Sequence, residues 1–134
     1  MGRLNAREWE ISLYPLAFSI GVIVVAFGVL FSIVSRYYLG SAWSLLTITS
    51  VNRPLIKEGP YRFVRHPIYL GLFVIWLGAS LIFFNWLGIA SAFLILLPLL
   101  YKRAAIEENN LIRSFGEEYR SIIESTGMLF PRFF

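Results

Sequence analysis

Two long runs without charge constrain the fold of this chain more than any other feature of its sequence. The first covers residues 11–34 and the second residues 67–101, and neither contains Asp, Glu, Lys or Arg. A helix over the first run is about 36 Å long, enough to cross a hydrocarbon core of about 30 Å with some tilt. Charged residues make up only 15% of the chain, too few to cover a water-soluble fold. The sequence therefore predicts an all-α membrane protein.

The second run is too long for one crossing. As a single helix it would extend about 52 Å, so it must fold back on itself. Asn85 is the strongly polar residue near its middle, and Trp86 and Gly88 follow it. We expect a tight helical hairpin there, with Trp86 at the membrane interface. The chain is thus predicted to be a single domain, residues 1–134, with transmembrane helices at about 11–34, 67–84 and 86–101.

The distribution of Lys and Arg predicts the orientation of these helices. The N-terminal tail has two such residues, the segment 35–66 has five, the hairpin turn has none, and the tail after Tyr101 has five. The positive-inside rule then places the N-terminus outside and the C-terminus in the cytosol. The middle segment and the C-terminal tail would therefore emerge on the same face of the membrane, where they can meet.

Composition excludes several kinds of site. The chain has no cysteine and one histidine, which excludes disulfides, thiolate metal sites and a cysteine nucleophile and argues against any metal centre in the protein. The net charge of +4 is explained by basic residues beside apolar spans, so we expect a membrane partner and no nucleic acid.

Four glycines recur at a helical spacing. Gly21 and Gly28 are seven residues apart, as are Gly71 and Gly78, so each pair shares one helix face. We expect these faces to allow close packing of helices.

Turn-forming residues bound the polar segment ahead of the second run. Pro54 favours an extended residue before it, and Gly59-Pro60 marks a turn. Pro67 suits the first position of a helix, because its missing amide proton is no loss there. His66 would then lie near the N-cap, beside unpaired backbone amides that can receive an anion.

Most of this segment also has an ordinary explanation in a membrane protein. Arg62 and Arg65 would serve as stop-transfer charges, and Tyr61 and Tyr69 as aromatic residues of the interface. That explanation accounts for neither the histidine nor the Gly-Pro turn.

The third helix is predicted to continue beyond Tyr101 as far as a C-cap at Gly116. Arg103 and Glu107 are four apart and share a face, while Glu107 and Glu108 repel each other unless a cation lies beside them. A solvated helix face is the alternative. After Gly116, the alternation of apolar and charged residues predicts a short amphipathic helix at the interface.

Taken in order, these segments resemble a known group of membrane enzymes. The stretch GPYRFVRHPIYLG at 59–71, the acidic pair 107–108, the FGEEY segment at 115–119 and Pro131 resemble the isoprenylcysteine carboxyl methyltransferase and phospholipid methyltransferase family. The likeness covers about residues 51–131. The absence of a second glycine in Gly59-Pro60-Tyr61 favours the carboxyl methyltransferase branch.

The resemblance implies that S-adenosylmethionine binds at the cytosolic face. By the same resemblance, the residues that contact this cofactor would be Leu55, Ile56, Tyr61, His66, Pro67, Ile68, Tyr69 and Glu107. The methyl acceptor would be a lipid or lipid-linked group that enters from the bilayer. Arg103 would face it and hold a carboxylate acceptor without any base, whereas an amine acceptor would need Glu108 or His66 as the base.

Two other functions stay open at this point. One is an NADPH-dependent membrane reductase related to the sterol reductases, although two carboxylates would repel its pyrophosphate. The other is a membrane subunit without catalytic activity. The chain has one predicted helix ahead of the motif where the enzymes it resembles have more, so a second subunit, such as another copy in a homo-oligomer, would be a further partner.

Overall fold

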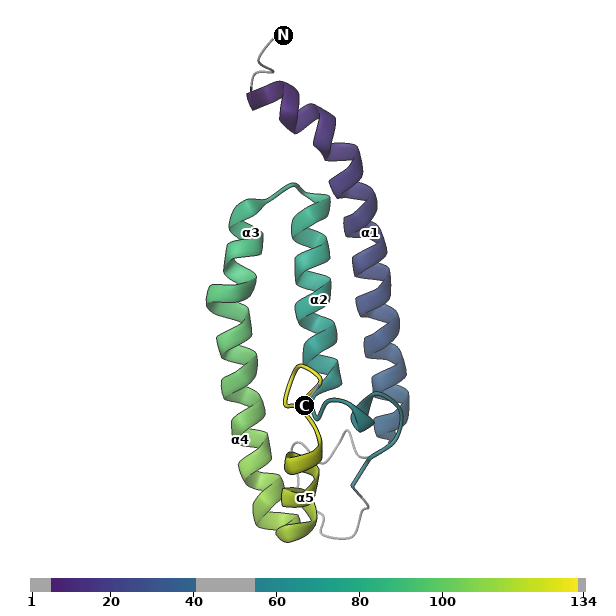
Figure 1. Cartoon of the computed structure of the whole chain (residues 1–134), viewed down its shortest axis with the longest axis vertical. Helices are drawn as coiled ribbons and strands as arrows, with labels where there is room; N and C mark the ends of the chain where they lie inside the picture. The colour runs from purple at the N-terminus through teal and green to yellow at the C-terminus, as the bar shows by residue number, and fades with distance from the viewer. Residues whose placement is uncertain (1–5, 41–54, 133–134) are drawn as a thin grey trace.

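A computed structural model describes residues 6–40 and 55–132, with side chains described from residue 11 onward. The elements are α1 (Ala6–Leu39), the 3-10 turn η2 (Gly59–Arg62), α2 (Pro67–Ile82), α3 (Trp86–Ser91), the π-helical turn η3 (Ala92–Leu96), α4 (Leu97–Phe115) and α5 (Glu117–Ser125). The predicted extended residue before Pro54 lies outside the described ranges. Figure 1 shows α1, α2 and the α3–α4 column side by side, with α5 folded against the lower end.

The helical class is confirmed, and two helices are long and apolar enough to cross a membrane. These are Ile11–Leu39 and Trp86–Phe115, whereas α2 has 16 residues and a length of about 24 Å. The first helix is longer than the predicted 11–34, because Arg36 ends the uncharged run without ending the helix. The Arg36 guanidinium donates a 2.8 Å hydrogen bond to the carbonyl of Gly40. The backbone of Gly40 has a φ of +52°.

Glycines hold α1 and α2 together as an antiparallel pair. A Cβ atom on Gly21 would lie 2.7 Å from the carbonyl oxygen of Gly78, and one on Gly28 would lie 3.1 Å from that of Gly71. Such distances leave room for hydrogen only, so the backbones approach closely at both levels. The predicted packing role of the four glycines is confirmed.

The hairpin between α2 and α3 is also confirmed. The Asn85 side chain caps α3 because its Oδ1 atom accepts a 3.0 Å hydrogen bond from the backbone amide of Gly88. The backbone amide of Asn85 donates to the carbonyl of Ser80 at 2.8 Å. The Trp76 indole donates to the carbonyl of Gly88 at 3.1 Å. These bonds tie the end of α2 to the start of α3.

The returning column contains a wide turn that was not predicted from the sequence. The amide of Leu97 donates to the carbonyl of Ala92, five residues earlier, and Pro98 follows directly. Proline has no amide proton and its ring crowds the carbonyl four residues before it, so a wider turn at this point relieves the conflict.

The column ends at Phe115, where Gly116 adopts a φ of +55°, as the predicted C-cap requires. α5 then buries Tyr119 and Ile122. The chain beyond α5 returns toward the hairpin and is drawn in yellow in Figure 1. There Leu129, 1% exposed, packs with Phe73 and Leu100, so this segment closes the lower end of the hairpin.

Candidate functional site

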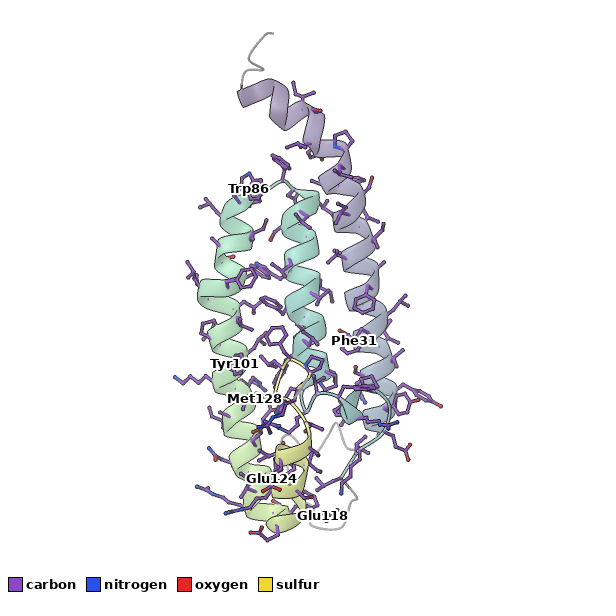
Figure 2. All side chains as sticks on the ribbon, in the orientation of Figure 1. Phe31, Trp86, Tyr101, Glu118, Glu124 and Met128 are labelled. Carbon is purple, nitrogen blue, oxygen red and sulfur yellow. The ribbon has the colours of Figure 1, made fainter. Side chains whose placement is uncertain are left out.

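The motif segment, residues 59–71, and the C-terminal segment, residues 126–132, lie side by side through their backbones. Val64 and Gly127 form an isolated parallel bridge. The amide of Arg65 donates to the carbonyl of Gly127 at 2.9 Å, and that of His66 to the carbonyl of Met128 at 3.0 Å. In Figure 2, Met128 lies beside the start of α2. These two segments, 63 residues apart in sequence at the bridge, therefore form one wall.

This pairing corrects one prediction. The amide of His66 is occupied by Met128, and the amides of Tyr69 and Leu70 donate to the carbonyl of His66 at 3.1 and 3.2 Å. The predicted unpaired amides beside His66 are therefore wrong for these three residues. Pro67 does occupy the first position of α2, as predicted.

Glu108 is a buried carboxylate held by two basic side chains. Its side chain is 8% exposed, and its Oε1 atom lies 2.6 Å from Arg65 Nε and 3.2 Å from His66 Nε2. The Nη2 atom of Arg65 adds a 3.4 Å hydrogen bond to Oε2. A buried carboxylate is tolerated because these partners replace its hydration.

Glu107, 12% exposed, has a different set of partners. Its Oε1 atom accepts a hydrogen bond from the Tyr69 hydroxyl and lies 3.3 Å from Arg103 Nε. Its Oε2 atom lies 3.6 Å from His66 Nδ1. The solvated-face alternative is therefore wrong for both acids, and the cations expected beside them are Arg65 and Arg103.

His66 lies between the two carboxylates, since each ring nitrogen faces one of them. The imidazole is stacked on the Tyr69 ring, with centroids 5.5 Å apart and an angle of 5° between the planes. The ring is 8% exposed. Position and tilt of the imidazole are thus fixed from three sides.

Arg103 is the exposed member of the cluster. Its Nε atom donates to the Tyr69 hydroxyl at 2.9 Å, yet 69% of its side chain is exposed. One edge of the guanidinium is therefore anchored while the rest is available for a further partner.

The other predicted site residues lie outside this network. Within the described ranges, its hydrogen bonds and ion pairs do not extend to Leu55, Ile56, Tyr61 or Ile68. Tyr61 belongs to η2, which packs on α1. Burial raises the pKa of Tyr61 to about 12, although the Arg36 guanidinium opposes the shift, so its phenol stays neutral at physiological pH.

Arg65 is a member of the site that was not predicted from the sequence, where it figured only in the ordinary explanation as a stop-transfer charge. A signal for it existed. Arg103 pairs with Glu107 at four residues' spacing, so the mutual repulsion of the acids required a second cation for Glu108. The sequence offers Arg62 and Arg65 within the same motif and does not distinguish them.

The cluster influences a neighbouring tyrosine as well. Burial raises the pKa of Tyr119 in α5, and the negative charge of Glu108 adds to the effect. This phenol also stays neutral, as its position beside a buried carboxylate requires.

Comparison with known proteins relates this sequence to a family. A methanethiol S-methyltransferase of Bradyrhizobium diazoefficiens is 39% identical over 53% of this chain and 24% of its own length. Protein-S-isoprenylcysteine O-methyltransferase of Schizosaccharomyces pombe is 31% identical over 69% of the chain and 41% of its own length. The enzyme of the same name from Saccharomyces cerevisiae is 28% identical over 84% and 48%.

In each of these three comparisons the match covers less than half the length of the relative. The profile of one family matches residues 9–113, which include most of α1, the motif segment, the hairpin and both acids of the cluster. The chain belongs to the isoprenylcysteine carboxyl methyltransferase family.

Proposed function

We propose that this protein transfers a methyl group from S-adenosylmethionine to a lipid or lipid-linked acceptor at the cytosolic face of a membrane. Family membership supports methyl transfer, and the relatives are named for methylating a thiol or an isoprenylcysteine. The observation that carries the proposal is the cluster in which His66 and Tyr69 of the motif segment contact Glu107 and Glu108 of α4.

The residues of the cluster fit the chemistry of the proposed cofactor, which carries an ammonium, a sulfonium and a carboxylate. Tyr69 and Arg103 both approach Oε1 of Glu107. Among the described residues, the contact of Oε2 is with the His66 nitrogen at 3.6 Å, so this atom retains acceptor capacity for an ammonium group. The ring of Tyr69 offers an aromatic face of the kind that attracts cations.

When bound, S-adenosylmethionine supplies a methyl group on a positively charged sulfur. Glu107 would hold the cofactor together with His66, Pro67, Ile68 and Tyr69. Leu55, Ile56 and Tyr61 would contribute further contacts to it. Because methyl transfer to an anion neutralises charge, the main contribution of the protein is to position the two reactants.

Arg103 would orient the acceptor. Its planar guanidinium matches a carboxylate in shape. Only the Nε atom is used in the hydrogen bond to Tyr69, so that bond leaves the two terminal nitrogens available to the acceptor. A carboxylate acceptor is already a nucleophile and needs no base. For an acceptor that must lose a proton, Glu108 and His66, 3.2 Å apart, are the groups that would receive it.

The proposed arrangement in the membrane is a single domain that crosses three times, with the N-terminus outside. α2 would cross in spite of its 16 residues, because its glycine contacts keep it beside α1. α5 would lie at the cytosolic interface. The exposed apolar face of α1, which includes Ile23, Phe27 and Leu30, would contact lipid or a second copy of the chain.

The test is isothermal titration of the full chain in detergent with S-adenosylhomocysteine. We expect binding by the wild-type protein and a loss of affinity of about tenfold or more in Glu107→Gln, the size of one hydrogen bond to a charged group. The matched control is Glu117→Gln on α5, whose side chain is 89% exposed. Thermal melting should show all three proteins folded.

Absence of binding by folded wild-type protein would contradict the proposed function, and equal affinities in the two variants would contradict the role of Glu107. The acceptor is then identified by incubation of lipids and small acids with methyl-deuterated cofactor. Mass spectrometry would detect the labelled product.

A further inference from the structure

Arg65 joins three separate segments through one buried guanidinium. Besides its two hydrogen bonds to Glu108 of α4, its Nη1 atom donates to the carbonyl of Ile123 at 3.2 Å and to that of Thr126. The latter two carbonyls lie at the end of α5. The side chain is 8% exposed.

These contacts differ from those of a charge that serves membrane topology. Such a charge acts from the lipid headgroups, as the exposed Arg62 three residues earlier can do. A guanidinium buried to this degree costs stability unless its donors are satisfied. Here the donors are directed at one carboxylate and two carbonyls, so Arg65 has a structural purpose within the site.

The position of the Glu108 carboxylate depends on Arg65, and the position of His66 depends on that carboxylate. Oε1 of Glu108 receives Arg65 Nε at 2.6 Å and approaches His66 Nε2 at 3.2 Å. The other ring nitrogen faces Glu107 at 3.6 Å. The contacts thus run from Arg65 through Glu108 and His66 to Glu107.

We propose that Arg65 is a positioning residue for the cofactor site: it fixes Glu108, and through Glu108 it orients the His66 ring toward Glu107 while holding the end of α5 against the hairpin. The role of the site as a cofactor site rests on the proposed function, whereas the orientation of His66 by Arg65 does not. Arg65 acts here without touching the cofactor.

Nuclear magnetic resonance tests the orientation directly, because His66 is the one histidine in the sequence. In protein labelled with 15N-histidine, we expect Arg65→Met to displace the ring nitrogen resonances of His66 at fixed pH. Arg62→Met, which removes the same charge from an exposed position, should leave them in place. Unchanged resonances in folded Arg65→Met would overturn the proposal.

Binding measurements test whether Arg65 acts through Glu108. We expect Arg65→Met to weaken S-adenosylhomocysteine binding about tenfold, and Arg65→Lys to restore part of the loss because lysine keeps the charge but lacks the planar fork. The double variant R65M/E108Q should bind no more weakly than Arg65→Met alone, since coupled residues are not additive. Additive losses would indicate a direct contact with the ligand and would overturn the proposal.

Two outcomes need separate controls. If Arg65→Met does not fold, Arg65→Lys is compared with Arg62→Lys: displaced His66 resonances in the former alone support the proposal, and coincident spectra overturn it. If the wild-type protein binds no S-adenosylhomocysteine, the proposed function fails, while the resonances still decide whether Arg65 orients His66.

Discussion

At the scale of single residues, the Tyr69 hydroxyl connects the two groups to which we assign different reactants. It accepts a hydrogen bond from Arg103 Nε at 2.9 Å and donates one to Glu107 Oε1. Its ring also supports the imidazole of His66. The oxygen and the ring of one side chain therefore serve separate purposes, and a substitution can remove one of them and keep the other.

We predict that Tyr69→Phe keeps the stacking on His66 and loses the bridge between Arg103 and Glu107. Loss of a hydrogen bond to a charged group should weaken S-adenosylhomocysteine binding by up to about tenfold. Titration calorimetry measures the affinity, with Tyr101→Phe as the control because Tyr101 is exposed on the same column as Arg103. Equal affinities of the two variants would contradict the prediction.

The sequence identified most members of this cluster but could not separate Arg65 from Arg62. Both stand in the stretch RFVR with similar neighbours. What makes them different is Glu108, 43 residues after Arg65, together with the carbonyls at the end of α5. Contacts of that range depend on how the segments meet, which local spacing does not encode.

At the scale of elements, the glycine contacts between α1 and α2 are the firmest link between sequence pattern and packing. Their spacing of seven predicted a shared face, and the structure places Gly28 against Gly71 and Gly21 against Gly78. The hairpin was also predictable from a sequence pattern, because the apolar run is too long for one crossing and Asn85 is the strongly polar residue near its middle.

We predict that Gly28→Val destabilises the protein by about 1 to 3 kcal/mol, the usual range for overpacking. A Cβ at this position would lie 2.8 Å from Ile75 Cγ1, and the helices would have to separate. Ala26→Val, on an exposed position of α1, is the matched control. Thermal melting in detergent measures both, and a Gly28→Val protein as stable as the control would refute this account of the packing.

Two features of the elements were not predictable from the apolar runs. α1 continues through Arg36 to Leu39. The charge of an arginine ends the hydrophobic stretch, but arginine is a good helix former and does not end the helix. The wide turn at Ala92–Leu96 depends on Pro98, and proline in a helix can also produce a kink or an end.

At the scale of the whole molecule, the proposed orientation places the hairpin turn and the cluster on opposite faces of the membrane. Figure 1 shows the turn between α2 and α3 at one end of the helices and α5 at the other. The chain has no cysteine, so single cysteines can report each face without background.

We predict that a membrane-impermeant maleimide added to right-side-out vesicles labels Leu87→Cys and spares Asn110→Cys. Leu87 follows the hairpin turn and is 82% exposed, whereas Asn110 is exposed on α4 beyond the acidic pair. Labelling of both should occur after the vesicles are opened with detergent. The reverse pattern in sealed vesicles would show that the proposed orientation is inverted.

The backbone pairing of residues 64–66 with 127–128 has a consequence for biogenesis. Gly127 and Met128 follow every helix of the site in the sequence, so the ribosome has already delivered α1, the hairpin and α5 before this wall can form. The nascent protein therefore passes through a stage in which its helices have been synthesised while the amides of Arg65 and His66 still lack the carbonyls that they bind in the finished fold.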